Sequence, residues 1–102
     1  MPLYQDVITF PVVKQDLAFV VDEHVTAAEL EASAQEAAGE QLRSIRVFDV
    51  YRGDQIGAGQ KSLALRVEFQ SPERTLSDED AAEIRGRIEK ALAERFGAEL
   101  RA

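Results

Sequence analysis

The chain has 102 residues, of which 45% are hydrophobic, and a formal net charge of −7. This size and composition predict one small globular domain rather than a disordered chain. The absence of cysteine excludes disulfides and thiolate metal sites, and a single histidine, His24, cannot build a zinc site or a catalytic triad, so we expect no metal site. The acidic charge argues against non-specific nucleic-acid binding, because polyphosphate attracts basic surfaces. It leaves open a small, shaped site for a few exposed bases.

Residues 1–13 contain Pro2 and Pro11 and are interpreted as an extended arm or the remnant of a linker. The folded domain is expected to span residues 14–102. No apolar run reaches the ~18 residues of a membrane helix, and the first residues do not follow the pattern of a signal peptide. We therefore expect a cytoplasmic domain, cut from a longer subunit, with no membrane partner.

The first strand is expected at residues 16–22, which are rich in strand formers. Strand alternation predicts two sets of side chains on opposite faces: Leu17, Phe19 and Val21 on one, and Asp16, Ala18 and Val20 on the other. A helix follows, because Thr26 and Glu29 fit a capping box and Gly39 supplies a stop.

The second strand is expected at residues 42–51. Alternation places Phe48 and Val50 on one face, and Val47, Asp49 and Tyr51 on the other. The step from Ile45 to Arg46 breaks the alternation, so a β-bulge is expected there.

The third strand, residues 61–70, carries the clearest pattern in the chain. Its apolar members are Leu63, Leu65, Val67 and Phe69, and its small or polar members are Ser62, Ala64, Arg66 and Glu68. Such alternation is typical of a sheet with one face packed and one face open to solvent.

The second helix begins after Ser77, where acidic residues favour a helix N-terminus, and Gly97 ends it. Residues 98–101 can add an edge strand, with Leu100 inward and Arg101 outward. The resulting order is β-α-β-β-α-β, and each helix has one apolar stripe. These features predict an α+β, ferredoxin-like sandwich, in which two helices cover one face of a four-stranded antiparallel sheet.

The glycine-rich stretch VYRGDQIGAGQKS, residues 50–62, superficially resembles a phosphate-binding loop. A phosphate loop needs glycine directly before the lysine and joins a strand to a helix, whereas this stretch joins two strands. We therefore expect a long hairpin loop that positions Tyr51 and Ser62. The glycines expected to supply positive φ angles are Gly53, Gly57 and Gly59.

The open face of the predicted sheet is the candidate binding site. Its small, aromatic and polar residues are Asp16, Ala18, Asp49, Tyr51, Ser62, Ala64 and Arg101. An aromatic ring offers a base a stacking surface worth ~1–3 kcal/mol, and a carboxylate matches the two N–H donors on guanine's Watson–Crick edge. On the pattern alone, a solvated sheet face with one exposed tyrosine is the simpler interpretation.

Five blocks in order along the chain add a second line of inference. They are residues 10–19 (FPVVKQDLAF), 47–53 (VFDVYRG), 59–65 (GQKSLAL), 74–79 (RTLSDE) and 96–101 (FGAELR). Together these blocks resemble the ferredoxin-fold anticodon-binding domain, which ends the β subunit of bacterial phenylalanyl-tRNA synthetase. The resemblance covers residues 10–101, almost the whole chain.

The resemblance implies that the domain docks the anticodon stem-loop of phenylalanine tRNA. By this resemblance, Tyr51 stacks on the first anticodon base, a guanine, with Asp49 beside it. Ala18 and Ser62 contact the neighbouring adenines, and Arg101 approaches the last base or its phosphate. The parent enzyme of the family is an (αβ)₂ heterotetramer that uses ATP and Mg²⁺. The implied partners are therefore the rest of the β subunit and the α subunit, with no cofactor and no catalysis expected in this chain.

One position departs from the family pattern. The family usually has a basic residue immediately before the aspartate of the first block, where this chain has Gln15. A phosphate contact expected there is in doubt, and the candidate substitutes are Lys14, Arg52 and Lys61.

Three other functions were weighed. An RNA-recognition motif needs outward aromatic residues on its third strand, where this chain has Ser62, Ala64 and Arg66. An acylphosphatase-like enzyme needs an asparagine, and the chain has none. A ferredoxin-like regulatory or interaction domain with no RNA role stays open as the alternative.

Overall fold

The computed structural model describes residues 10–53 and 56–101. Its elements are β1 (Val13–Asp22), α1 (Ala27–Ala38), the 3₁₀ turn η1 (Gly39–Gln41), β2 (Leu42–Tyr51), β3 (Gln60–Phe69), α2 (Asp78–Phe96) and β4 (Glu99–Leu100). Most of the predicted N-terminal arm, residues 1–9, lies outside the described residues.

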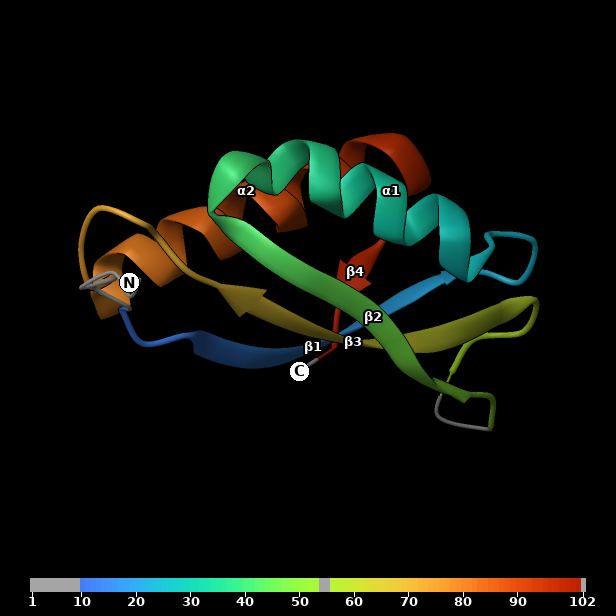
Figure 1. The fold of residues 1–102 in the computed structure, drawn as a ribbon. Coiled ribbons are helices and arrows are strands. Elements are labelled where there is room, and N and C mark those ends of the chain that lie inside the picture. Colours follow the sequence, from blue (N-terminus) through green and yellow to red (C-terminus); the bar gives the residue numbers. More distant parts are fainter. Residues whose placement is uncertain (1–9, 54–55, 102) are drawn as a thin grey trace.

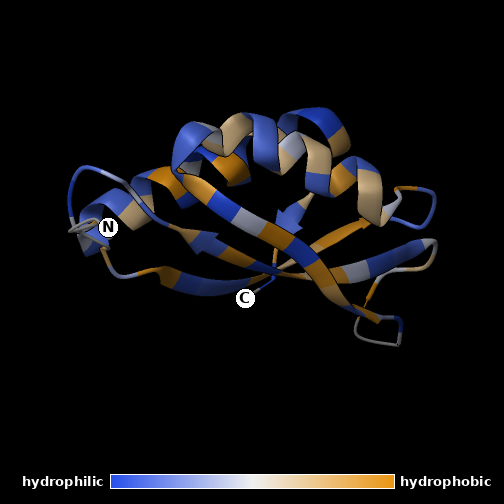
Figure 2. Ribbon diagram, in the orientation of Figure 1, coloured by the Kyte–Doolittle hydropathy of each residue, from blue (hydrophilic) through white to orange (hydrophobic). Residues whose placement is uncertain are grey.

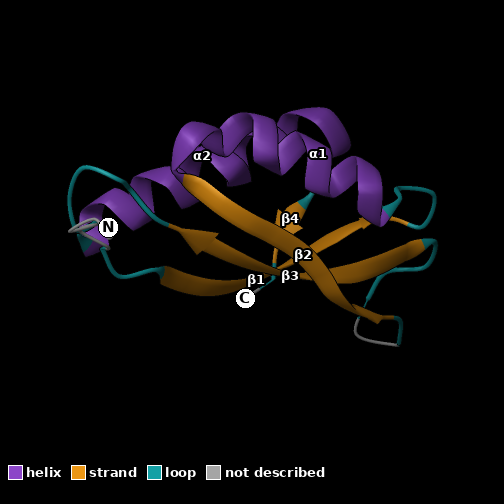
Figure 3. Cartoon of the chain, viewed as in Figure 1, coloured by secondary structure: helices purple, strands orange, loops and turns teal. Residues whose placement is uncertain are grey.

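The strands form one antiparallel sheet in the order β2-β3-β1-β4. Both helices lie on the same side of this sheet (Figures 1 and 3). This arrangement confirms the predicted ferredoxin-like α+β sandwich. Within residues 10–53 and 56–101 no helix lies on the other side of the sheet, and we call that side the open face.

The core lies between the helices and the sheet. The alternation of hydrophobic and hydrophilic residues along the strands is visible in Figure 2. The inward residues predicted for β1 and β3 are all buried: Leu17, Phe19, Val21, Leu63, Leu65, Val67 and Phe69. They meet apolar residues of the two helices, including Leu30, Ile84, Ile88 and Leu92. The period-2 pattern thus fixes which face of the sheet the helices cover.

Both helices begin with the predicted polar caps. The Thr26 hydroxyl accepts a hydrogen bond from the backbone N–H of Glu29, whose carboxylate accepts from the Thr26 N–H in return. Ser77 and Asp80 repeat this capping box at α2. Arg74 also donates two hydrogen bonds to the Asp80 carboxylate, so the same side chain caps the helix and holds the preceding loop.

The Asp80 cap is expected to make the free energy of unfolding depend on pH. The Arg74 guanidinium, followed by the backbone N–H of Ser77, lowers the pKa of the Asp80 carboxyl below its usual value. Because the unfolded chain then binds the proton more readily, this stabilisation is complete above about pH 4 and is lost progressively below it. The unfolding midpoints of wild type and Asp80→Asn should therefore differ at neutral pH and converge in acid. A difference that stays constant down to acid pH would contradict this assignment.

The position of the bulges in β2 differs from the prediction. The pairing with β3 shifts register between Leu42 and Ser44 and again between Val47 and Asp49, while Ile45 and Arg46 pair regularly. The bulge predicted at the Ile45–Arg46 step is therefore wrong. An extra residue in one strand resets the alternation of every side chain that follows it.

The second bulge reassigns the faces of β2. Residues directly opposite one another in an antiparallel pair point to the same face. Val47 lies opposite the buried Leu65, so its predicted place on the face of Asp49 and Tyr51 is wrong. Val50 lies opposite the buried Leu63.

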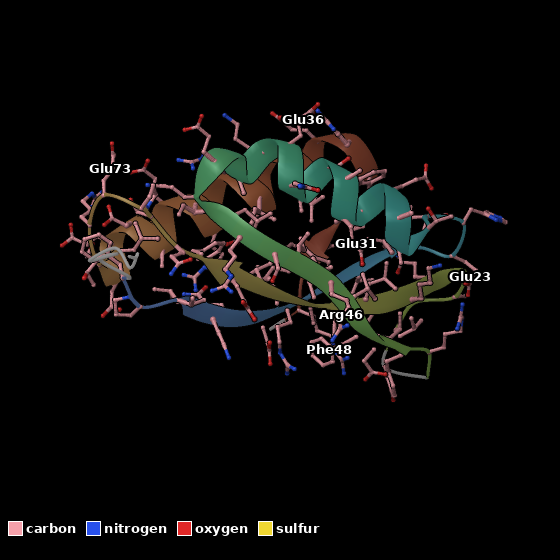
Figure 4. The ribbon with its side chains drawn as sticks, viewed as in Figure 1. Glu23, Glu31, Glu36, Arg46, Phe48 and Glu73 are labelled. Carbon is pink, nitrogen blue, oxygen red and sulfur yellow. The ribbon has the colours of Figure 1, made fainter. Side chains whose placement is uncertain are left out.

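Phe48 is the extra residue at this bulge, and its ring lies over Arg66 on the open face. Figure 4 shows Phe48 on the side of the sheet away from the helices. The prediction that Phe48 and Val50 share a face is therefore also wrong.

Candidate nucleic-acid interface

The open face is built from rows of side chains that cross β2, β3 and β1. The first row holds Tyr51, Ser62 and Val20; the second holds Asp49, Ala64 and Ala18; the third holds Arg46, Arg66 and Asp16. Neighbouring rows are two residues apart along β1 and β3, which corresponds to about 6.6 Å, whereas on β2 the bulge at Phe48 puts Arg46 and Asp49 three residues apart. Six of the seven residues predicted for the site therefore lie together on this face. The seventh, Arg101, reaches it from the end of β4.

Arg101 and Tyr51 form a stacked pair over the first row. The backbone N–H of Arg101 donates to the Ala18 carbonyl at 2.6 Å, which anchors the residue beside β1. Its guanidinium carbon lies 5.1 Å from the centre of the Tyr51 ring, on the far strand β2. The two side chains therefore reach toward each other across β3 and β1, the strands that lie between β2 and β4. Ser62, which lies between Tyr51 and Val20 in the same row, is only 3% exposed.

Gly53 leaves room for the Tyr51 ring. A Cβ atom at Gly53 would lie 2.6 Å from the Tyr51 hydroxyl oxygen and 2.9 Å from the ring carbon that bears it, so any larger residue would displace the ring. The loop prediction is correct for Gly59, which has φ 75°, and wrong for Gly53 and Gly57, which do not have positive φ. The spacing Tyr-x-Gly was the sequence signal for this contact.

The second row supplies a flat floor and a carboxylate. Ala18 and Ala64 lie directly opposite each other, and their small side chains leave the sheet surface low. Asp49 lies beside Ala64 and is exposed. Its side chain makes no hydrogen bond or ion pair with any described residue, so its carboxylate is available to N–H donors of a ligand.

The third row is held by an ion pair. Arg66 Nε and Nη2 lie 3.0 and 3.1 Å from the two carboxylate oxygens of Asp16. These hydrogen bonds lower the pKa of the Asp16 carboxyl below its usual value. Asp16 is thus on the predicted face but already has a partner. The same guanidinium lies 4.5 Å from the centre of the Phe48 ring, a residue that sequence alternation had assigned to the other face.

The three candidate phosphate contacts have different surroundings. Lys14 lies opposite Glu68 on the open face and forms no ion pair with any described residue. Arg52 donates hydrogen bonds of 2.7 and 2.6 Å to the Glu23 carboxylate. Lys61 lies opposite the buried Val21, away from the open face, with its Nζ 3.7 Å from the same carboxylate. The structure therefore brings Lys14, but not Lys61, to the predicted site.

Gln15, which stands where the family usually has a basic residue, does not lie on the open face. Gln15 lies opposite the buried Val67, so its side chain belongs to the helix-covered face. Its side-chain oxygen accepts a hydrogen bond of 3.5 Å from Arg85 of α2. Gln15 is therefore turned away from the face that carries Tyr51.

Residues 10–53 and 56–101 contain neither a metal-binding cluster nor a membrane-spanning helix. No group of three or more His, Asp or Glu side chains is arranged to hold a metal ion there. Neither helix in this part of the chain has the length and hydropathy needed to span a membrane.

Residues 9–101 match the family model of the ferredoxin-fold anticodon binding domain. The phenylalanine–tRNA ligase β subunit of Bifidobacterium longum is 57% identical over 94 residues, which are 92% of this chain. The β subunit of the same name from Thermobifida fusca is 52% identical over 93 residues, or 91% of the chain. The chain covers 11% of the length of each of these relatives.

These matches confirm the resemblance found in the five sequence blocks. The matched family is defined by binding rather than by a reaction, which agrees with the expectation that this chain is not itself catalytic. The chain belongs to the ferredoxin-fold anticodon-binding domain family.

Proposed function

We propose that the chain binds the anticodon stem-loop of phenylalanine tRNA on its open face, as a non-catalytic module of a phenylalanine–tRNA ligase β subunit. The observation that carries this proposal is the gathering of Tyr51, Asp49, Ser62 and Arg101 over the floor formed by the opposed alanines. Sequence-specific RNA recognition uses unstacked bases that stack on aromatic rings and are read along their edges. The family match supports the same ligand class.

Each residue has a role in this proposal. The Tyr51 ring stacks on the first anticodon base, and Asp49, two residues away on the same face, accepts from the N–H donors of guanine. Ala18 and Ser62 contact the two adenines. Arg101 contacts the last base or its phosphate. Because Arg101 already covers part of the Tyr51 ring, the base stacks on the ring surface that Arg101 leaves open or takes its place.

The proposal extends to the parent protein. The names of the relatives support a synthetase complex. We infer that the partners are the rest of the β subunit and the α subunit of an (αβ)₂ heterotetramer in the cytoplasm. ATP and Mg²⁺ act in the catalytic part of that enzyme, and this chain needs no cofactor for its own role.

Removal of the Tyr51 ring is expected to weaken RNA binding and to abolish triplet preference. Tyr51→Ala should lose about 1–3 kcal/mol of binding free energy for a GAA stem-loop, because a stacked base loses its aromatic partner. Tyr51→Phe keeps the ring and should retain most of that free energy. The measurement is a fluorescence titration of stem-loops carrying GAA or a scrambled triplet with both variants and wild type.

The ratio of the two affinities, rather than either affinity alone, decides the result, because a chain with net charge −7 is expected to bind RNA weakly. Equal binding of both triplets by wild type would contradict base readout, and no binding of either stem-loop would favour the alternative, a regulatory or interaction domain with no RNA role.

A further inference from the structure

We propose that a second RNA contact lies beside the triplet site, where Phe48, Arg66 and Arg46 receive one unstacked nucleotide that flanks the anticodon triplet. This inference rests on the proposed function and assigns a separate surface to it. The surface lies along β2 and β3, one row beyond Asp49 and Ala64.

The bulge in β2 creates the aromatic part of this surface. Counted back from Tyr51 and Asp49, alternation would place Phe48 on the core side, but the register shift between Val47 and Asp49 leaves both Phe48 and Asp49 on the open face. Its side chain is 45% exposed, and Figure 4 shows it beside Arg46 on the side away from the helices. The Arg66 guanidinium covers part of the ring at 4.5 Å. An aromatic ring and a guanidinium plane are both surfaces on which unstacked RNA bases lie.

The shape of the surface suits one flat ring. A hollow of about 220 Å³ opens here, lined by Ser44, Ile45, Arg46, Phe48, Arg66 and Glu68. Of the side chains on the open face, Phe48 supplies the apolar part of the lining, and Arg46, Arg66 and Glu68 are charged. Such a combination accommodates a base against the apolar part and leaves its phosphate at the rim.

One arginine of this surface has no side-chain partner within the described part of the chain and can bind a phosphate. Arg46 and Arg66 lie directly opposite each other, and like charges in this position destabilise a sheet. The Asp16 carboxylate compensates Arg66, and Glu68 also lines the hollow, but the Arg46 side chain makes no hydrogen bond or ion pair with any residue in the described ranges. Arg46 is therefore the cation of this surface that is available to a phosphate oxygen of the ligand.

The position of the surface makes it continuous with the triplet site. Ser62, Ala64 and Arg66 follow one another along the same face of β3, each about 6.6 Å from the next. A single strand whose bases are unstacked over Tyr51 and the alanine floor can therefore continue to Phe48. Because Phe48 adjoins the row of Asp49 and Ala64, and because bases of the stem are paired and not free to stack on a side chain, the nucleotide assigned to Phe48 is one adjoining the triplet.

The affinity of Phe48→Ala for the GAA stem-loop tests whether a base stacks on the Phe48 ring. Loss of one base–aromatic stack corresponds to about 5- to 150-fold weaker binding. Removing the base of the flanking nucleotide, with an abasic position on each side of the triplet in turn, should weaken wild-type binding at one of the two positions. The same abasic loop should not weaken Phe48→Ala further. The matched control is Val50→Ala, because Val50 is 43% exposed on the same strand but faces the helix side.

Arg46→Ala tests whether Arg46 contacts a phosphate of the RNA. One lost phosphate contact to single-stranded RNA should lower the slope of log affinity against log salt by about 0.7. Lys90→Ala removes the same charge from the exposed surface of α2 and should leave that slope unchanged. Circular dichroism spectra that match wild type show that each variant is folded.

The two proposals fail in different ways. If wild type binds GAA and scrambled loops equally, the triplet site fails and this inference fails with it. If wild type prefers GAA but Phe48→Ala binds as tightly as Val50→Ala, or neither abasic loop weakens wild-type binding, only the second contact is overturned.

Discussion

Ala64→Glu is expected to abolish binding of the GAA stem-loop while the chain stays folded. Ala64 lies at the centre of the open face, between Asp49 and Ala18. A glutamate there would stand where the bases must approach and would add a negative charge against the phosphates. Like charges brought together in an interface cost several kcal/mol, on the order of a 100-fold or greater loss of affinity. Affinity is measured by titration, and folding by thermal unfolding.

The matched control is Ala82→Glu, which adds the same side chain on the exposed surface of α2. It changes the net charge equally and should leave affinity within a few-fold of wild type. A neutral variant, Ala64→Leu, separates size from charge and is expected to weaken binding as well. If Ala64→Glu and Ala82→Glu weakened binding equally, the alanine floor would not be the binding surface.

Phe69→Ala is expected to have the largest effect on stability. Phe69 is fully buried at the end of β3, where it pairs with both Val13 and Leu42. Truncating a buried phenylalanine costs about 3–5 kcal/mol, because apolar contacts are lost and a cavity remains. Small domains have a total stability of about 5–15 kcal/mol, so the variant should unfold at much lower urea concentration.

Phe48→Ala is the control for this measurement, because it removes the same ring from the open face, where 45% of the side chain is exposed. It should cost far less stability, with the lost Arg66 contact contributing about 0.5–1 kcal/mol. Equal losses for the two variants would mean that the core does not lie between the helices and the sheet.

Much of the fold could be predicted from local patterns. The alternation in β3 identified the packed and open faces, since each apolar residue from Leu63 to Phe69 is buried as expected. The caps at Thr26 and Ser77 set where the helices begin. These features depend on neighbours within a few residues of sequence, which is why the sequence alone reveals them.

The faces of β2 could not be predicted in the same way. Val47, Phe48 and Val50 are all good strand formers, so composition does not show which of them is the extra residue. Only the pairing with β3 decides it. The error mattered for function, because it hid Phe48 from the open face while leaving the assignments of Asp49 and Tyr51 correct.

Contacts between residues that are far apart in the chain also could not be predicted from the sequence. Glu23 binds Arg52 from 29 positions away in the chain. The Glu31 carboxylate of α1 accepts a hydrogen bond of 2.8 Å from the backbone N–H of Val47, next to the bulge (Figure 4). The contact between Arg101 and the Tyr51 ring joins the two edges of the sheet, next to β4 and on β2. Each of these contacts joins residues that are distant in the sequence, so it forms only in the folded chain and no local sequence pattern predicts it.

Amide chemical shifts recorded while the GAA stem-loop is added test most directly whether the open face binds RNA. The expected result is that shifts concentrate on the open-face residues Ala18, Asp49, Tyr51, Ser62 and Ala64, and that a scrambled triplet reduces them. The amides of α1 and α2 should change little, because the helices lie on the other side of the sheet. Shifts confined to the helices, with the open-face amides unchanged, would contradict RNA binding on this face.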